Sequence, residues 1–425
     1  MTDRSHDRTI GDRTLAPETL MLGYGYDPAL SEGSVKPPVF LTSTFVFRSA
    51  EEGRDFFDVV AGRKPAPEGG AGLVYSRFNQ PNSEIIEDRL AIYEAGEGAL
   101  VFGSGMAAIT TAILATARPG DVILHSKPLY GGTETLLTRT LANFGITAHG
   151  FPDGTDPEAI HRAAAEACTL GRLSLIMIET PSNPLNTLVD IAAVRAASDR
   201  VGEITGLRPL VACDNTMLSP VFQQPLRHGA DIVVASLTKY IGGHSDLIGG
   251  AVIGSRDLLK PVRLLRSAIG TQLDPHSCWM VGRSLETLAI RVRAAAGHAD
   301  TVIRAMDAHP KVVAVHALGA GRGNPAVQSI YRTQCTGPGS TFAIELAGGQ
   351  EEAFRVLNRL RLFKLAVSLG GTESLVCHPA STTHSGVPAE QRARIGVTDG
   401  LIRLSIGLEN EDDLVADLTQ ALAVL

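Results

Sequence analysis

The chain of 425 residues lacks the cysteine and histidine patterns that hold small secreted proteins or metal sites together. Its five cysteines are scattered without a Cys-x-x-Cys pair, and its twelve histidines show no metal-ligand spacing. Disulfide frameworks and structural zinc sites depend on such patterns. We therefore expect no bound metal, no disulfide framework and a reduced, cytoplasmic environment.

The chain also lacks an excess of positive charge and an unbroken apolar run of membrane length. Acidic residues outnumber basic ones by 45 to 38, which argues against a nucleic-acid surface. Residues 1–14 mix Asp and Arg around no apolar core, unlike a signal peptide. Residues 98–117 carry no charge, but Gly103, Ser104 and Gly105 divide them. We expect neither nucleic acid nor a membrane as a partner.

Glycine, in contrast, is plentiful, and its 44 residues predict many tight turns and close backbone approaches. The chain is too long for one compact core, so two or three domains are expected. Residues 62–72 form a Pro/Gly-rich loop within an N-terminal part of little periodicity. We divide the chain into an N-terminal segment (1–79), a large domain (80–290) and a C-terminal domain (291–425).

The large domain alternates short apolar runs with helical patterns. Several of the runs are apolar on both faces, which is typical of buried parallel strands. The predicted strands are 99–102, 121–125, 173–179, 209–214, 231–236 and 250–253. Strands that alternate with helices indicate an α/β fold with a doubly wound, mostly parallel sheet.

The last third of the chain predicts a smaller α+β domain. A helical pattern over 278–308 leads into it, and a final helix begins after Asn410 with Leu414, Leu418 and Leu422 as its apolar stripe. Between them we expect strands at 312–316, 340–346 and 401–405 and a helix at 351–358.

The strongest chemical signal is Lys239, which follows the apolar strand 231–236. A lysine that forms a Schiff base must lose its proton near neutral pH, so it needs a partly desolvated site under positive influence. Ser236 and Thr238, two hydroxyl residues beside it, are suited to bind a phosphate. Taken alone, a loop lysine is more often simply solvated.

Asp214 ends another apolar strand 25 residues before Lys239. Ligands of parallel sheets bind at the carboxyl ends of the strands, so the two side chains should face one crevice. A carboxylate there can keep the ring nitrogen of pyridoxal phosphate (PLP) protonated, which makes the ring an electron sink. The alternative is that Asp214 caps a helix or turn.

Gly103–Ala108 reads G-x-G-x-x-A between a strand and a helix. That pattern resembles a dinucleotide fingerprint, although no acid closes a following strand at the right distance. Free backbone N–H groups at a helix N-terminus bind any phosphate.

Three further clusters carry polar or aromatic residues beside predicted strands or in the N-terminal part. Tyr130 can stack on a cofactor ring, and Asn183 can reach a ring hydroxyl. Tyr75 and Arg77 lie in the N-terminal segment. Singly, each is more often a turn, cap or surface residue.

Together and in this order, the clusters resemble the Cys/Met-metabolism family of fold-type-I PLP enzymes. The family includes cystathionine γ-synthase, cystathionine γ-lyase, methionine γ-lyase and the homoserine sulfhydrylases. The resemblance runs from about Pro37 to Leu425, and its most specific stretches are 236–246, 368–381 and 403–407.

The resemblance implies a role for each candidate residue. Lys239 would form the Schiff base with PLP, Asp214 would pair with the ring nitrogen, and Tyr130 would stack on the ring and protonate the leaving group. The phosphate would be bound by Gly105, Met106, Ser236 and Thr238. Asn183 would meet the ring hydroxyl and, with Arg403 and Ser368, would bind the substrate carboxylate. Tyr75 and Arg77 would reach the phosphate of a neighbouring subunit, as in a homodimer or a homotetramer built as a dimer of dimers.

Two departures bear on the reaction. Val367 stands where many cystathionine-handling members have Glu, which favours a methionine γ-lyase-like C–S lyase that performs γ-elimination. Gly132 stands where methionine γ-lyases usually have Cys. The alternatives are γ-replacement on an O-acyl-homoserine, β-elimination as in cystathionine β-lyase, and a PLP-type fold that only binds.

Overall fold

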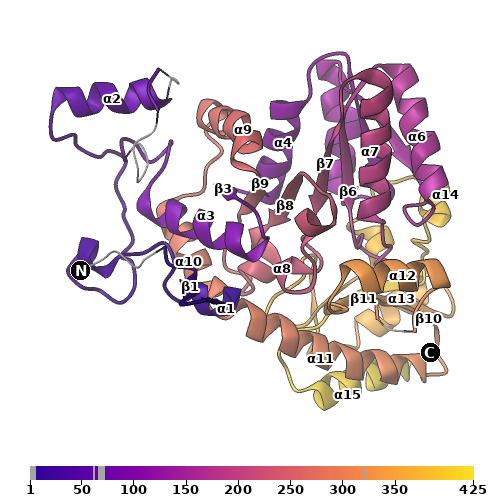
Figure 1. The fold of residues 1–425 in the computed structure, drawn as a ribbon. Helices are drawn as coiled ribbons and strands as arrows, with labels where there is room; N and C mark the ends of the chain where they lie inside the picture. Colours follow the sequence, from indigo (N-terminus) through magenta and orange to yellow (C-terminus); the bar gives the residue numbers. More distant parts are fainter. Residues whose placement is uncertain (1–5, 61–62, 66–71, 320) are drawn as a thin grey trace.

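The computed structural model of the chain describes residues 6–60, 63–65, 72–319 and 321–425. Most of the loop expected at 62–72 lies outside these ranges. Two sheets organise the rest (Figure 1). No described helix is long and apolar enough to cross a membrane.

The larger sheet contains seven strands in the order β3-β9-β8-β7-β6-β4-β5. Strands β4 to β8 pair in parallel, whereas β9 runs antiparallel to both β3 and β8. The strands are β3 (Gly98–Phe102), β4 (Asp121–Ser126), β5 (Thr147–Phe151), β6 (Arg172–Glu179), β7 (Leu210–Asp214), β8 (Ile232–Ser236) and β9 (Gly250–Gly254). The mostly parallel sheet expected from the sequence is confirmed.

Helices cover both faces of this sheet (Figure 1). Helices α4 (Gly105–Thr116) and α9 (Arg256–Ile269) share one apolar cluster with the strands. On the other face lie α6 (Pro157–Leu170) and α7 (Ile191–Thr205), and beside them α3 (Pro81–Tyr93), α10 (Pro275–Leu285) and α11 (Leu288–Asp307). Burial on both faces explains why the strands read as continuous apolar runs.

The smaller sheet has the order β10-β11-β14-β13-β12 and is antiparallel except for β12 and β13. Its strands are β10 (Val312–His316), β11 (Thr341–Leu346), β12 (Lys364–Leu365), β13 (Leu375–Cys377) and β14 (Leu401–Ser405). The helices of this part are α12 (Pro325–Gln334), α13 (Gln350–Leu357), α14 (Ala389–Arg394) and α15 (Glu411–Leu422). Asn410 caps α15 as predicted, and its apolar stripe is buried. The domain boundaries at 79/80 and 290/291 stay a prediction.

The predicted helix over 278–308 is wrong as a single element, because α10 ends at Leu285 and α11 begins at Leu288. The break leaves the Ser284 carbonyl free to accept a hydrogen bond from Arg291 on α11 at 3.0 Å. The same guanidinium donates to the carbonyls of Tyr240 and Ile241 in the loop after β8. The bend therefore brings α11 onto the segment that carries Lys239.

The N-terminal part holds more regular structure than expected. Short strands β1 (Thr9–Ile10) and β2 (Arg13–Thr14) pair, α1 (Pro17–Leu20) follows, and α2 (Ala50–Val60) stands apart from both sheets in Figure 1. In the N-terminal arm, residues 40–60, Val46 is 94% exposed and Phe57 is 46% exposed, so the arm leaves apolar surface uncovered by its own chain, whereas Met21 before it is buried.

Candidate active site

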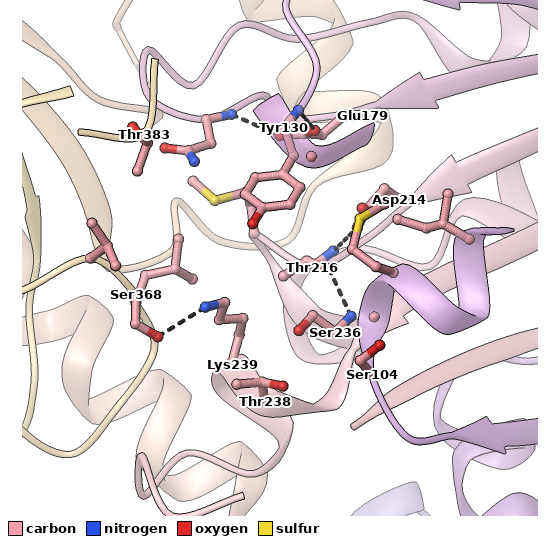
Figure 2. Close-up of a pocket in the computed structure, with 18 of the residues that line it drawn as sticks. Ser104, Tyr130, Glu179, Asp214, Thr216, Ser236, Thr238, Lys239, Ser368 and Thr383 are labelled. Atoms are coloured by element: carbon pink, nitrogen blue, oxygen red, sulfur yellow. Dashed lines mark hydrogen bonds between the residues drawn. The ribbon is translucent and has the colours of Figure 1, made fainter. Parts of the chain in front are cut away.

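A cavity of about 570 Å³ lies at the carboxyl ends of β4, β6, β7 and β8 (Figure 2). The C-terminal part closes it with residues 367–369, 382–383 and Arg403. Every residue expected to act within one subunit lines it, namely Gly105, Met106, Tyr130, Asn183, Asp214, Ser236, Thr238, Lys239, Ser368 and Arg403. Tyr75 and Arg77 do not.

Lys239 lies just after β8, in a loop whose backbone departs from helical geometry at this residue (φ −87°, ψ −132°). Its Nζ donates a hydrogen bond to Ser368 Oγ at 2.9 Å (Figure 2). Burial lowers the pKa of the Lys239 amine, and the positive charge of Arg403 lowers it further. This is the desolvated, positively influenced setting that a Schiff-base lysine needs.

The loop around Lys239 is held from the C-terminal part as well as by Arg291. The Tyr240 hydroxyl lies 2.8 Å from Thr341 Oγ1 and 3.1 Å from Ser340 Oγ on the β11 side. Gly370 packs so closely on Tyr240 that a side chain there would collide with it. The position of Lys239 thus depends on contacts from both halves of the chain.

Asp214 ends β7 on the other side of the cavity from Lys239 (Figure 2). It is 7% exposed, and its Oδ1 accepts a hydrogen bond from the Thr216 N–H at 2.9 Å. Burial raises the pKa of the Asp214 carboxyl, while the Thr216 contacts oppose that shift. A cationic ring nitrogen placed beside it would favour the ionised form.

Behind Asp214, a buried polar network fixes the next residue, Asn215. Its Nδ2 donates to the Glu94 carboxyl at 3.0 and 3.2 Å and to the Gln223 carbonyl at 2.8 Å. Glu94 is the C-cap residue of α3 and is fully buried. Burial raises its pKa to about 8, with Asn215 opposing the shift.

The N-terminus of α4 points its first N–H groups at the cavity, and Ser104 caps it by accepting from Ala107 N at 3.0 Å. The Ser236 side chain faces this turn, since a Cβ on Gly105 would lie 3.2 Å from Ser236 Cβ. Gly250 on β9 has no room for a side chain, because an added Cβ would collide with the Ser104 carbonyl. Such a cradle of N–H and hydroxyl donors suits a phosphate.

Thr238, the other expected phosphate ligand, lines the cavity with its hydroxyl engaged elsewhere. Its Oγ1 accepts from Gly249 N at 3.0 Å and donates to Gly249 O at 3.3 Å. Donation to a phosphate would replace the longer of these two contacts.

Arg403 is 2% exposed, and no ion pair joins it to an acid among the described residues. It donates to Asn183 Oδ1 at 3.0 Å and to the Ser368 carbonyl at 2.6 Å, and its buried Nε has no partner in that part of the chain. Ser368 adopts a strained backbone with φ +121°. A buried cation without a counter-ion suits a bound carboxylate.

Tyr130 is 44% exposed at the cavity, and its backbone N–H donates to Glu179 Oε2 at 2.5 Å. The sequence reasoning overlooked Glu179, Ser104, Thr216, Thr382 and Thr383 as lining residues. Ser104, Glu179 and Thr216 lie close in sequence to predicted site residues. No pattern in the sequence indicates that residues 382–383 line the cavity.

Tyr75 and Arg77 lie together outside the cavity of their own chain. The Arg77 guanidinium donates to the Ser267 carbonyl and lies 4.7 Å from the ring centre of Phe78 and 5.9 Å from that of Tyr75. Their expected role on a neighbouring subunit stays a prediction. No group of three metal-ligating side chains occurs among the described residues.

The residues present fit PLP, on the evidence of four features at one cavity. The α4 N-terminus offers a phosphate cradle, and Lys239 offers an amine of lowered pKa. Asp214 offers a buried carboxyl and Arg403 a buried guanidinium, neither of which has an ion-pair partner among the described residues.

Comparisons with known proteins point the same way. A family model described as Cys/Met metabolism PLP-dependent enzyme matches residues 18–423. An L-methionine γ-lyase of Pseudomonas deceptionensis is 38% identical over 96% of this chain and 97% of its own. An O-succinylhomoserine sulfhydrylase of Pseudomonas aeruginosa is 35% identical over 93% of this chain and 92% of its own. The crystal structure of a cystathionine γ-synthase of Xanthomonas oryzae pv. oryzae matches with a TM-score of 0.85 and 35% identity. The match covers 97% of this chain and 98% of that one.

Proposed function

Because the chain belongs to the Cys/Met-metabolism family of PLP-dependent enzymes, we propose that it performs γ-elimination on a sulfur-containing amino acid, as a methionine γ-lyase-like C–S lyase. Membership confirms the predicted cofactor and the enzyme class, a PLP enzyme of sulfur amino-acid metabolism. The observation that carries the proposal is that one cavity contains both the Lys239 amine, whose pKa is lowered, and the Arg403 guanidinium, which has no acidic partner among the described residues.

Each step needs a group that this cavity supplies. Arg403 binds the carboxylate of the amino acid with its forked N–H groups, and Asn183 and Ser368 hold Arg403 in place. The Lys239 amine, when it is not bonded to the cofactor, would take the proton from Cα, and departure of the γ-substituent would also require that a second proton leave Cβ. Bound PLP supplies the electron sink for the charge that develops there.

The remaining groups act on the cofactor and the leaving group. Asp214 keeps the ring nitrogen protonated through an ion pair. Tyr130, whose ring stands at the open side of the cavity, stacks on the cofactor and donates a proton to the departing thiolate. Gly105, Met106, Ser236 and Thr238 bind the phosphate.

Replacement at Cγ is the second candidate, because it shares every step up to loss of the γ-substituent. Val367 is 54% exposed and presents an apolar side chain to the cavity, which favours an uncharged sulfur side chain over the polar end of cystathionine. A Cβ added at Gly132 would lie 2.6 Å from Tyr130 Cε1, so a side chain at this position would require the Tyr130 ring to move. β-Elimination on the same scaffold is the remaining alternative.

Product analysis tests the choice of reaction. The purified holoenzyme is given methionine, cystathionine or an O-acyl-homoserine, each with and without an added thiol. γ-Elimination yields a 2-oxo acid, ammonia and a thiol from methionine without any second substrate. A product that forms only when a thiol is added would identify the replacement reaction, and pyruvate from cystathionine would identify β-elimination.

The same proposal covers the setting in which the enzyme works. It acts in the cytoplasm as a homodimer or a homotetramer, and Tyr75 and Arg77 of one chain reach the cofactor phosphate of the next. The exposed apolar side chains of the N-terminal arm support an interface there.

A further inference from the structure

Glu179 is a buried acid that lines the cavity. It ends β6, is 4% exposed, and is the register partner of Asp214 on β7. Register partners on adjacent parallel strands present their side chains on the same side of the sheet, and both residues line the cavity.

Each carboxyl oxygen of Glu179 accepts a hydrogen bond from the backbone of a different predicted site residue. Oε1 accepts from Asn183 N at 2.9 Å, and Oε2 accepts from Tyr130 N at 2.5 Å (Figure 2). Tyr130 follows β4, whereas Asn183 lies in the loop after β6. One side chain therefore ties together two loops that come from neighbouring strands.

Keeping an acid at this position is unfavourable. Burial and the nearby charge of Asp214 both raise the pKa of Glu179, and the two backbone N–H groups only partly offset them. No described lysine or arginine forms an ion pair with it. The isosteric Gln would remove the charge problem, but its amide has one acceptor oxygen, so one of the two N–H groups would face an NH₂ group. The carboxyl is the side chain of this shape that satisfies both donors.

The two loops matter because of what they carry. The side chain of Asn183 accepts from Arg403 Nη1 at 3.0 Å, so a shift of this loop moves the group that binds the substrate carboxylate. The backbone of Tyr130 begins α5 (Gly131–Thr135) and sets where its ring stands over the cavity.

We propose that Glu179 is a positioning residue, which fixes the Tyr130 ring and the Asn183–Arg403 pair relative to each other by accepting both backbone N–H groups. The proposal rests on the function above for what Tyr130 and Arg403 bind. The bridge itself is a property of the chain without cofactor.

The test compares Glu179→Gln with the matched control Glu134→Gln. Glu134 is an acid on α5 whose charge acts on Glu179, but its side chain makes no hydrogen bond to either loop in the described part of the chain. Amide hydrogen exchange is followed at Tyr130 and Asn183 in both apoproteins. Because the Gln amide offers only one acceptor oxygen for the two N–H groups, exchange at one or both amides should be ~10-fold or more faster in Glu179→Gln, and the control should match the wild type.

The holoenzymes supply the second readout. In Glu179→Gln we expect the visible circular dichroism of bound PLP to fall and KM for the amino acid to rise more than kcat falls, because orientation is lost while Lys239 is untouched. Unchanged exchange at both amides together with an unchanged KM would overturn the proposal.

Two further outcomes remain informative. If Glu179→Gln does not fold, exchange in the wild-type apoprotein still decides, since rapid exchange at either amide would show that the bridge does not exist. If the holoenzyme lacks lyase activity on every substrate while the exchange result holds, the proposed function fails and the positioning role stands.

Discussion

Burial and a neighbouring cation act in the same direction on the Lys239 amine, and this one residue carries both the cofactor bond and the proton transfer. Either effect alone would lower its pKa, and together they favour the neutral amine that attacks a carbonyl. Ser368 Oγ receives its Nζ hydrogen bond, so the free amine has a fixed position when no imine is present.

Lys239→Ala is expected to abolish turnover, because it removes the covalent anchor and the base together. The variant can still bind PLP through the phosphate cradle, but borohydride should no longer attach the cofactor to the chain. Mass spectrometry after borohydride treatment checks this, with the exposed Lys260→Ala as a control that keeps the label. Near-normal activity in Lys239→Ala would contradict the whole mechanism.

Arg403→Lys is expected to raise KM for the amino acid, although it keeps the charge. A lysine cannot reproduce the planar fork that donates two parallel hydrogen bonds to a carboxylate, and it would leave Asn183 Oδ1 or the Ser368 carbonyl without its donor. Steady-state kinetics measure the effect. An unchanged KM would mean that the carboxylate binds elsewhere.

Sequence reasoning found the residues whose chemistry is visible in one side chain, such as Lys239 and Arg403. It missed Glu179 and Thr216, because their work is to bind backbone groups that the fold brings close. Thr216 Oγ1, for example, accepts from Ser236 N at 2.9 Å across 20 positions of sequence. Contacts of this kind depend on strand register, which apolar patterning alone does not specify.

At the scale of elements, Glu94 at the buried C-terminal end of α3 contacts Asn215, the residue that follows Asp214. Glu94 accepts hydrogen bonds from Asn215 there, and no lysine or arginine of the described residues forms an ion pair with it. An acid with a raised pKa binds a proton in the folded state that the unfolded chain has already released. Stability from this group is therefore present at low pH and is lost as the pH rises from about 4.5 towards 8.

Glu94→Gln is expected to reduce the loss of stability with rising pH, because the amide keeps the shape and the contact with Asn215 but cannot ionise. Thermal midpoints of the apoproteins from pH 5 to pH 8 measure it. The wild type should fall more steeply than Glu94→Gln across this window, and the exposed Glu351→Gln gives the background for removing one acid. Parallel curves for wild type and Glu94→Gln would show that Glu94 is ionised throughout.

Most strands of the two sheets were predictable, including edge strands β3 and β10, whereas β5, β12 and β13 were not. Strands β4, β6, β7 and β8 are buried on both faces and read as apolar runs. Edge strand β5 is TAHGF and mostly half-exposed, so it carries no such signal. Strands β12 and β13 are two and three residues long, too short for any periodicity to appear.

At the scale of the whole molecule, the site of a single chain contains no contribution from Tyr75 or Arg77. Tyr75 pairs with Thr44 of the N-terminal arm, which leaves apolar side chains such as Val46 exposed, and such segments are normally ordered by docking on something larger. A charge-assisted contact from Arg77 to a neighbour's phosphate would couple cofactor affinity to assembly.

Mixing two inactive variants tests that coupling. Arg77→Ala should weaken both PLP retention and the oligomer, and Lys239→Ala should be dead. After subunit exchange, a mixed dimer contains one site with an intact Lys239 and an intact Arg77 from the other chain, so activity should partly return. Exchange is verified by mass spectrometry of differently tagged chains, and a mixture that stays dead despite it would place the whole site within one chain.

Residues from both sheets and their loops line the cavity, and this division affects how the range of accepted substrates can change. The groups expected to hold the cofactor follow strands of the larger sheet, whereas residues 367–369 and 382–383 belong to loops of the smaller one. Substitutions at Val367, Thr382 and Thr383 in those loops can reshape the pocket for a new side chain, whereas Ser368 in the first loop also contacts Lys239 and Arg403. Homologues with this division of the cavity can therefore differ in the substrate side chain that they accept while they keep the same cofactor chemistry.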